Sequence, residues 1–113
     1  MISLSTHTLN STTGAHAAGV NVKLFALSED KIIELWSRYT DEDGRLSVQF
    51  ELDVKYKNCD LLLSFYINHY FAQNSTGVQT KSVNLNIKLP DPDGTYHLPI
   101  IISPHGASMW WSN

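Results

Sequence analysis

The sequence predicts an all-β fold, a sandwich or barrel of about eight short strands with one short helix. Apolar residues alternate with polar ones almost everywhere, and the segment 83–89 is the clearest case, because Asn84, Asn86 and Lys88 separate its apolar side chains. Alternation of this period places one face of a strand on a core and the other toward water. Turn signals separate the alternating segments at intervals of roughly 8–12 residues, which is typical of a sandwich or a barrel.

The expected strands follow from the alternation and from the turns between them. In chain order they span residues 2–9, 20–27, 31–39, 45–51, 60–67, 81–89, 95–103 and 106–112. Strong turns precede two of them, DEDG at 41–44 and DPDG at 91–94, because proline presets φ and glycine accepts a positive φ. Looser loops are expected at 14–19 and 74–77, and the segment 68–73 is the one candidate helix.

The strand expected at 95–103 contains the densest apolar run, Leu98-Pro99-Ile100-Ile101-Ile102. A run of this kind is typical of a strand that is covered on both faces. Pro99 has no N–H to donate to a ladder, so the sequence predicts that this strand lies at a sheet edge or contains a bulge.

Length and composition indicate one globular domain over residues 1–113. A chain of 113 residues builds one hydrophobic core and not two. Its apolar fraction of 42% and charged fraction of 17% are the reverse of the balance found in disordered proteins. So many apolar and so few charged residues in a short chain also predict that some apolar surface is buried in an oligomer.

The charge and the hydropathy pattern exclude two classes of partner. The net charge is −3 and the eight basic residues are scattered, whereas phosphate binding gathers them into one field, so nucleic acid is not an expected partner. No stretch approaches the roughly 18 consecutive apolar residues of a membrane span. The first residues lack the features of a secretory signal, and Cys59 is the only cysteine, so we expect a structural thiol in a cytoplasmic protein.

Read one at a time, the polar residues leave their roles open. None of the five histidines is spaced as metal ligands are on a helix or in a zinc knuckle, so no metal is expected. Arg45 directly follows the acidic turn 41–44, and it either pairs with those carboxylates or presents its planar donors to a carbonyl or an anion. From the residues alone, the interpretation stops at an all-β domain with unassigned polar side chains.

Several separated segments together resemble one family. Residues 4–10 (LSTHTLN) are similar to a first strand that carries a His before Leu-Asp, and residues 14–20 (GAHAAGV) resemble a Gly-x-Pro-Ala-Ala loop with His16 at the proline position. Residues 40–45 (TDEDGR) match a Thr-Asn-x-Asp-Gly-Arg turn. The most specific segment is 96–104 (YHLPIIISP), which is similar to His-Tyr-His-Val-Pro-Leu-Leu-Leu-Ser-Pro. Order, spacing and length agree, so the chain resembles the transthyretin and hydroxyisourate-hydrolase family over essentially its whole length.

The resemblance implies a transthyretin-like two-sheet sandwich that assembles as a homotetramer, a dimer of dimers with its active sites in the channel between the dimers. His7, Arg45 and His97 fall on the family's three catalytic positions. Transthyretin, a hormone carrier, lacks this trio, so its presence favours an enzyme. The implied activity is that of a 5-hydroxyisourate hydrolase of purine metabolism, which opens a urate-derived cyclic amide by adding water and needs no metal or cofactor. Histidines suit acid and base catalysis and an arginine suits a developing oxyanion, and the choice of base between the two histidines stays open.

The C-terminal residues depart from the family's pattern. The family closes with Tyr-Arg-Gly-Ser in the same channel, and here Trp110, Trp111, Ser112 and Asn113 take those places. Together with His105, which stands where an aromatic residue is common, they are the expected substrate-binding residues. Strand alternation sends the two indoles to opposite faces, where one lines the pocket and the other contacts a neighbouring subunit, or both serve only as interface packing. The exchange makes the pocket more apolar and better suited to stacking on a planar ring.

Three functions stay open at this stage. The chain is a 5-hydroxyisourate hydrolase that tolerates an altered tail, or a relative that opens or closes another planar heterocycle in a biosynthetic pathway, or a non-catalytic small-molecule carrier like transthyretin. Each of them takes a small heterocyclic molecule as its partner. If the sandwich were purely structural, the presence of His7, Arg45 and His97 would have no explanation.

Overall fold

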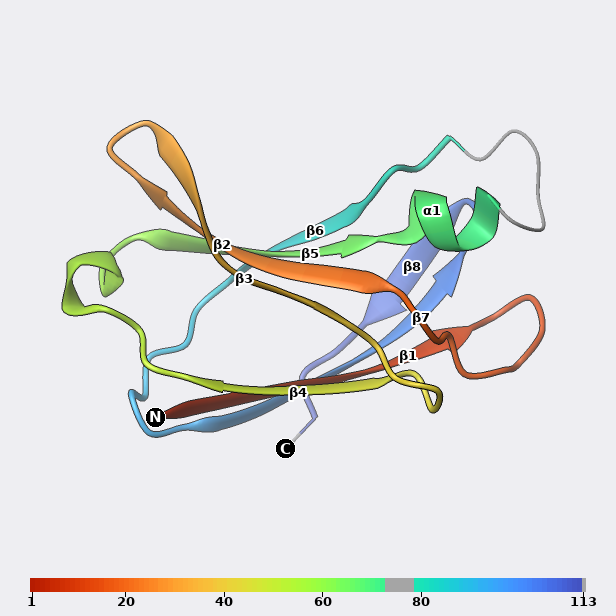
Figure 1. The fold of residues 1–113 in the computed structure, drawn as a ribbon, viewed down its shortest axis with the longest axis horizontal. Helices are drawn as coiled ribbons and strands as arrows, with labels where there is room; N and C mark the ends of the chain where they lie inside the picture. The colour runs from red at the N-terminus through yellow and green to blue at the C-terminus, as the bar shows by residue number, and fades with distance from the viewer. Residues whose placement is uncertain (73–78, 113) are drawn as a thin grey trace.

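The computed structural model describes residues 1–72 and 79–112, which form two four-stranded sheets packed face to face (Figure 1). The elements, in chain order, are β1 (Ile2–Asn10), β2 (Asn21–Ser28), β3 (Lys31–Tyr39), β4 (Arg45–Phe50), the 3₁₀ helix η1 (Val54–Tyr56), β5 (Asp60–Tyr66), α1 (Ile67–Ala72), β6 (Val83–Ile87), β7 (Thr95–Ser103) and β8 (Gly106–Met109). The predicted all-β sandwich with one short α-helix is confirmed.

The two sheets take their strands from different parts of the chain. The first sheet has the strand order β4-β1-β7-β8, and the second has the order β3-β2-β5-β6. Within the described residues, β1 and β7 form the only parallel pair, and the other neighbouring strands run antiparallel. The inner strands of the first sheet are thus β1 and β7, from the two ends of the chain (Figure 1).

The predicted boundaries lie within two residues of the observed ones, except at the last strand. β8 ends at Met109 and not at residue 112, although the residues that follow it continue to bond to the backbone of β7. The helix η1 was not predicted; Asp53 caps it by accepting a hydrogen bond from the N–H of Lys55. Gln73, the last residue of the predicted helix, and the predicted loop 74–77 lie outside the described residues. No helix in the described part of the chain is long and apolar enough to cross a membrane.

The prediction that Pro99 marks a sheet edge or a bulge is wrong. β7 lies between β1 and β8, and its register with both strands runs without interruption. The missing N–H of Pro99 falls opposite Trp110, just after β8 ends, and Trp110 donates its own N–H to the Pro99 carbonyl at 3.3 Å. The apolar run around Pro99 is covered on one face and not on two, because Ile101 stays half-buried between two fully buried isoleucines.

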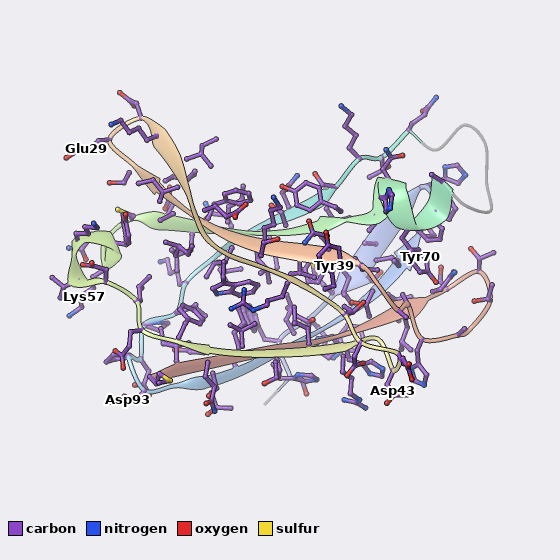
Figure 2. All side chains as sticks on the ribbon, in the orientation of Figure 1. Glu29, Tyr39, Asp43, Lys57, Tyr70 and Asp93 are labelled. Carbon is purple, nitrogen blue, oxygen red and sulfur yellow. The ribbon has the colours of Figure 1, made fainter. Side chains whose placement is uncertain are left out.

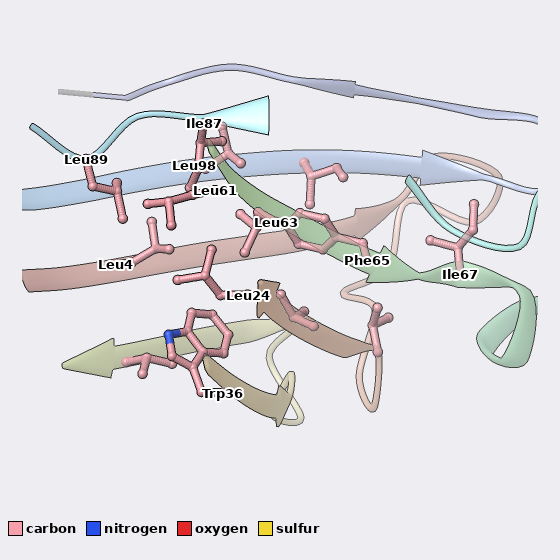
Figure 3. Close-up of a cluster of buried hydrophobic side chains, with 14 of the residues drawn as sticks. Leu4, Leu24, Trp36, Leu61, Leu63, Phe65, Ile67, Ile87, Leu89 and Leu98 are labelled. Carbon is pink, nitrogen blue, oxygen red and sulfur yellow. The ribbon is translucent and has the colours of Figure 1, made fainter. Parts of the chain in front are cut away.

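The core lies between the sheets and fixes which residues face outward. Leu4, Leu63, Phe65 and Leu98 are among its fully buried side chains (Figure 3), and burying a side chain of this size contributes about 1.5–3 kcal/mol. In β1 the even-numbered residues are buried and the odd-numbered ones are partly exposed. The odd-numbered residues therefore lie on the outer face of the first sheet.

The two ends of the sandwich differ in what they carry. Asp43 and Tyr70 lie toward one end, and Lys57 and Asp93 lie toward the other (Figure 2). At the first end, Asn10 donates a hydrogen bond from Nδ2 to the hydroxyl of Tyr70 at 3.3 Å, which ties α1 to the end of β1. A hollow of about 460 Å³ opens beside Lys57 at the second end, and its mainly apolar lining contains none of the predicted trio.

Candidate active site

The turn that precedes β4 sets the position of Arg45. The carboxylate of Asp41 accepts hydrogen bonds from the backbone N–H groups of Asp43 and Arg45, both at 2.9 Å. Gly44 has a φ of 70°, and its carbonyl accepts a hydrogen bond from the N–H of Thr8 at 2.7 Å. A side chain on Gly44 would overlap the carbonyl oxygen of Thr8, so this close approach of the turn to β1 requires glycine. The turn thus begins β4 with Arg45 beside β1.

Arg45 and His7 lie opposite each other on the outer face of the first sheet. They are direct partners in the register of β1 and β4, and opposite residues in an antiparallel pair have Cβ atoms about 4.5–5.5 Å apart. None of the ion pairs among the described residues involves Arg45, and the carboxylate of Asp41 is occupied by backbone N–H groups. The structure therefore does not support the salt-bridge interpretation of Arg45.

His97 extends the same face onto β7. It lies opposite Ser5 in the parallel pair of β1 and β7, and the Oγ of Ser5 lies 2.7 Å from Nδ1 of His97. Ser5, Arg45 and His97 together line a cleft of about 240 Å³. Because Ser5 engages Nδ1, the other ring nitrogen, Nε2, is the one that His97 offers to a ligand. Sequence reasoning missed Ser5, whose role depends on a strand pairing that no local pattern reveals.

The register across the first sheet arranges these side chains in two adjacent rows. One row contains Arg45, His7, Pro99 and Trp110, and the next contains Ser47, Ser5, His97 and Ser112. Adjacent rows on one face are two residues apart along each strand, which is roughly 7 Å. The structure therefore brings the three residues of the predicted trio into one patch.

His16, which sequence reasoning did not assign to the site, lies beside His7. Nδ1 of His16 is 3.0 Å from Nε2 of His7, and the two rings stack with their centroids 5.1 Å apart and their planes at 29°. The one signal in the sequence was that His16 stands at the proline position of the resembling loop. Among the described residues, no group of three His, Cys, Asp or Glu side chains is placed to hold a metal ion.

The surroundings of His7 keep its ring neutral. Partial burial lowers the pKa of His7 below its ordinary value of 6.5, and the charges of Arg45, His16 and His97 lower it further. A hydrogen bond with the backbone of Asp43 raises this pKa, but the lowering effects prevail. An imidazole is charged at a pH below its pKa and neutral at a pH above it. At pH 7 His7 is therefore neutral and can accept a proton.

The two C-terminal indoles lie on opposite sides of the first sheet, as strand alternation predicts. Trp110 stands opposite Pro99, whose neighbours on β7 are buried, so Trp110 lies on the outer face and is 47% exposed. Trp111 lies on the other side, where its ring packs edge-on against Tyr96 with the centroids 6.1 Å apart. Trp110 is therefore the indole that shares a face with the trio.

The other predicted substrate-binding residues that the structure describes lie at separate places, and of these only Ser112 lies beside the trio. Ser112 donates its N–H to the carbonyl of His97 at 2.8 Å, and together with Trp111 and His97 it lines a second hollow of about 210 Å³. His105 lies in the exposed turn between β7 and β8 and lines a different hollow with Ser11, so one chain by itself does not bring His105 to the trio. Asn113 lies outside the described residues.

Comparison with known proteins confirms the resemblance that the sequence shows. The model of the HIUase/Transthyretin family matches residues 4–111. A 5-hydroxyisourate hydrolase of Halalkalibacterium halodurans is 30% identical over 112 residues, covering 95% of this chain and 94% of that protein. The 5-hydroxyisourate hydrolase 2 of Rhizobium meliloti is 28% identical over 113 residues, covering 95% of this chain and 92% of that protein. The solved structure of Klebsiella pneumoniae 5-hydroxyisourate hydrolase is similar over 100% of both chains, with a TM-score of 0.80 and 25% identity. The chain belongs to the HIUase/Transthyretin family.

Proposed function

We propose that the chain is a 5-hydroxyisourate hydrolase, a cofactor-independent enzyme that opens a urate-derived cyclic amide by adding water. The observation that carries this proposal is the placement of His7, Arg45 and His97 in adjacent rows on one face of the first sheet. Relatives of that name match nearly the whole chain. The trio supplies acid–base and anion-binding groups, which hydrolysis needs and carriage does not. The proposed compartment is the cytoplasm, which the unpaired Cys59 supports.

In this proposal each side chain has one task in the ring opening. The oxygen of water bonds to the lactam carbonyl carbon, the ring C–N bond breaks, and the released nitrogen takes up a proton. Neutral His7 supplies the basic nitrogen that finally holds the proton released by water. Arg45 holds the carbonyl oxygen, on which negative charge develops, with two parallel N–H donors. His97, whose Nδ1 is held by Ser5, donates a proton from Nε2 to the departing nitrogen.

One observation favours a second candidate function, ring opening or cyclisation of another planar heterocycle. Trp110 completes the row that contains Arg45 and His7, so an indole lies where the tail of the resembling family supplies a phenol. An indole presents a larger flat apolar face with a single N–H donor. The same trio would then act on a ring that stacks on Trp110.

The direct test follows the ultraviolet decay of freshly made 5-hydroxyisourate with and without the purified chain. We expect the protein to accelerate the decay well beyond the spontaneous rate. An inert wild type that becomes active when residues 110–113 are replaced by Tyr-Arg-Gly-Ser would favour the second candidate. If the graft is also inert and a planar ligand binds tightly, the chain is a carrier and the hydrolase proposal fails.

We also propose that the chain forms a homotetramer, a dimer of dimers, with the outer faces of the first sheets facing one another across the channel. Support comes from Trp110, which is 47% exposed on that face, and from the partly exposed Ile101 beside it. Burying exposed apolar surface of this kind against a partner stabilises the assembly by about 25 cal/mol per Å². Light scattering should give four times the mass of one chain, and Trp110→Glu should shift that mass toward smaller species. A single-chain mass at micromolar concentration for the wild type would contradict the assembly.

A further inference from the structure

The backbone holds His16 beside His7. The N–H of Asn10 bonds to the carbonyl of Ala15 at 2.8 Å, and the N–H of Ala17 bonds to the carbonyl of Thr8 at 2.9 Å. These two bonds lie on either side of His16 and pair the returning loop with the end of β1. Ala17 is fully buried, so the loop is also anchored in the core. The backbone therefore positions the ring of His16 beside His7, although the side chain of His16 is exposed to solvent.

The 3.0 Å contact between the two rings fits either direction of the hydrogen bond, and a backbone hydrogen bond from His7 to Asp43 selects one of them. One of the two facing nitrogens must carry the hydrogen and the other must accept it. Since Nε2 of His7 faces His16, the hydrogen bond between His7 and the backbone of Asp43 falls to Nδ1–H of His7. Nε2 of His7 is then the unprotonated nitrogen, and His16 donates its Nδ1–H to it. This arrangement leaves Nε2 of His16 free to take up a proton from the solvent side.

The positive charges around His7 and His16 disfavour a proton that is held by His7 alone. His7 faces Arg45 from β4, His97 from β7 and His16 from the loop, and each of these charges lowers its pKa. The carboxylate of Asp41, in the turn before β4, is held by backbone N–H groups. Sharing a proton with the exposed ring of His16 moves positive charge away from Arg45.

We propose that His16 is a positioning residue and proton relay for His7, so that the hydrogen-bonded pair of imidazoles accepts the proton that the reaction releases. The proton from the attacking water binds Nε2 of His16, and the Nδ1 proton of His16 shifts toward Nε2 of His7. After His97 has protonated the departing nitrogen, the pair returns its proton to solvent through Nε2 of His16 and His97 regains a proton from solvent, so no other reactant is needed. This chemical role rests on the proposed hydrolase function, whereas the pairing of the two rings does not.

The test is a pH titration of ¹⁵N-histidine-labelled protein followed by NMR, in the wild type and in His16→Ala and His16→Asn. In His16→Ala, His7 loses the hydrogen-bond donor to its unprotonated nitrogen and also loses a neighbouring positive charge. The pKa of His7 should therefore rise by about 0.5 to 1, which corresponds to the net strength of an ordinary hydrogen bond. Asparagine carries an amide N–H near the position of Nδ1, so His16→Asn should keep the tautomer of His7 and part of its lowered pKa. His69→Ala is the matched control, because His69 is exposed on α1, and it should leave the titration of His7 unchanged.

Two results would overturn the pairing: an unchanged tautomer and pKa of His7 in His16→Ala, or a His16→Asn protein that titrates like His16→Ala. These measurements use no substrate, so their outcome is independent of whether the chain hydrolyses 5-hydroxyisourate. If it does, both variants should lose at least about tenfold in kcat/KM at neutral pH, because neither carries a relay nitrogen in place of Nε2. Wild-type kcat/KM in both variants would refute the relay.

Discussion

Replacing Arg45 with alanine should lower kcat/KM for 5-hydroxyisourate by about 10²–10³-fold, the loss typical of removing a donor to a developing oxyanion. The structure places Arg45 opposite His7 and in one cleft with His97, and no carboxylate among the described residues pairs with its guanidinium. The side chain is exposed, so the free energy of unfolding should change by less than about 0.5 kcal/mol. Initial rates and thermal unfolding of the same preparations measure the two effects.

Two further variants separate the role of the guanidinium from that of its charge. Arg45→Lys keeps the positive charge but loses the planar pair of donors, so it should recover only part of the lost rate. Arg38→Ala removes an exposed guanidinium from β3 in the second sheet and should leave kcat/KM unchanged. The proposed role of Arg45 is wrong if Arg45→Ala retains wild-type kcat/KM or if Arg38→Ala loses as much.

Replacing His7 with alanine should lower kcat/KM by about 10²–10⁴-fold, the usual contribution of general acid–base catalysis. The pKa of His7 is lowered from 6.5, first by burial and then by Arg45, His16 and His97. The ring is charged below this pKa and cannot accept a proton there. In the wild type, kcat/KM should therefore rise with pH through a midpoint below 6.5 and stay level at neutral pH.

A pH–rate profile of His7→Ala checks this assignment. The rise with a midpoint below 6.5 should disappear, because the group that titrates has been removed. His69→Ala, which removes an exposed histidine from α1, should keep both the rate and the profile of the wild type. An unchanged midpoint in His7→Ala would mean that another group is the base.

The scaffold of the site was predictable because its signals are local. Alternation predicts that a strand has one face on the core, and in β1 the even-numbered residues are indeed buried while the odd-numbered ones are partly exposed. The DEDG sequence predicts the turn before Arg45, and both Asp41 and Gly44 adopt roles that follow from their chemistry. The opposite orientation of Trp110 and Trp111 follows from the same two-residue period.

The contacts within the site were not predictable, because they join segments that are far apart in the chain. Ser5 and His97 are 92 positions apart, and their 2.7 Å contact exists only because β1 pairs with β7 in one particular register. A shift of that register by one residue would send His97 to the core face. The wrong expectation for Pro99 has the same origin, since the sequence shows the missing N–H but not which strands lie beside it.

By itself, the sequence determined the all-β class, most of the strand boundaries and the opposite orientation of Trp110 and Trp111, because the period of the apolar residues and the chemistry of the turns act over a few neighbouring positions. Only the tertiary structure decided which side chains meet. The pairing of β4, β1, β7 and β8 arranges Arg45, His7 and His97 in adjacent rows, and the loop after β1 returns His16 to His7. The physical reason is that strand pairing is set by the fit of the whole core, and that fit is not contained in any one segment.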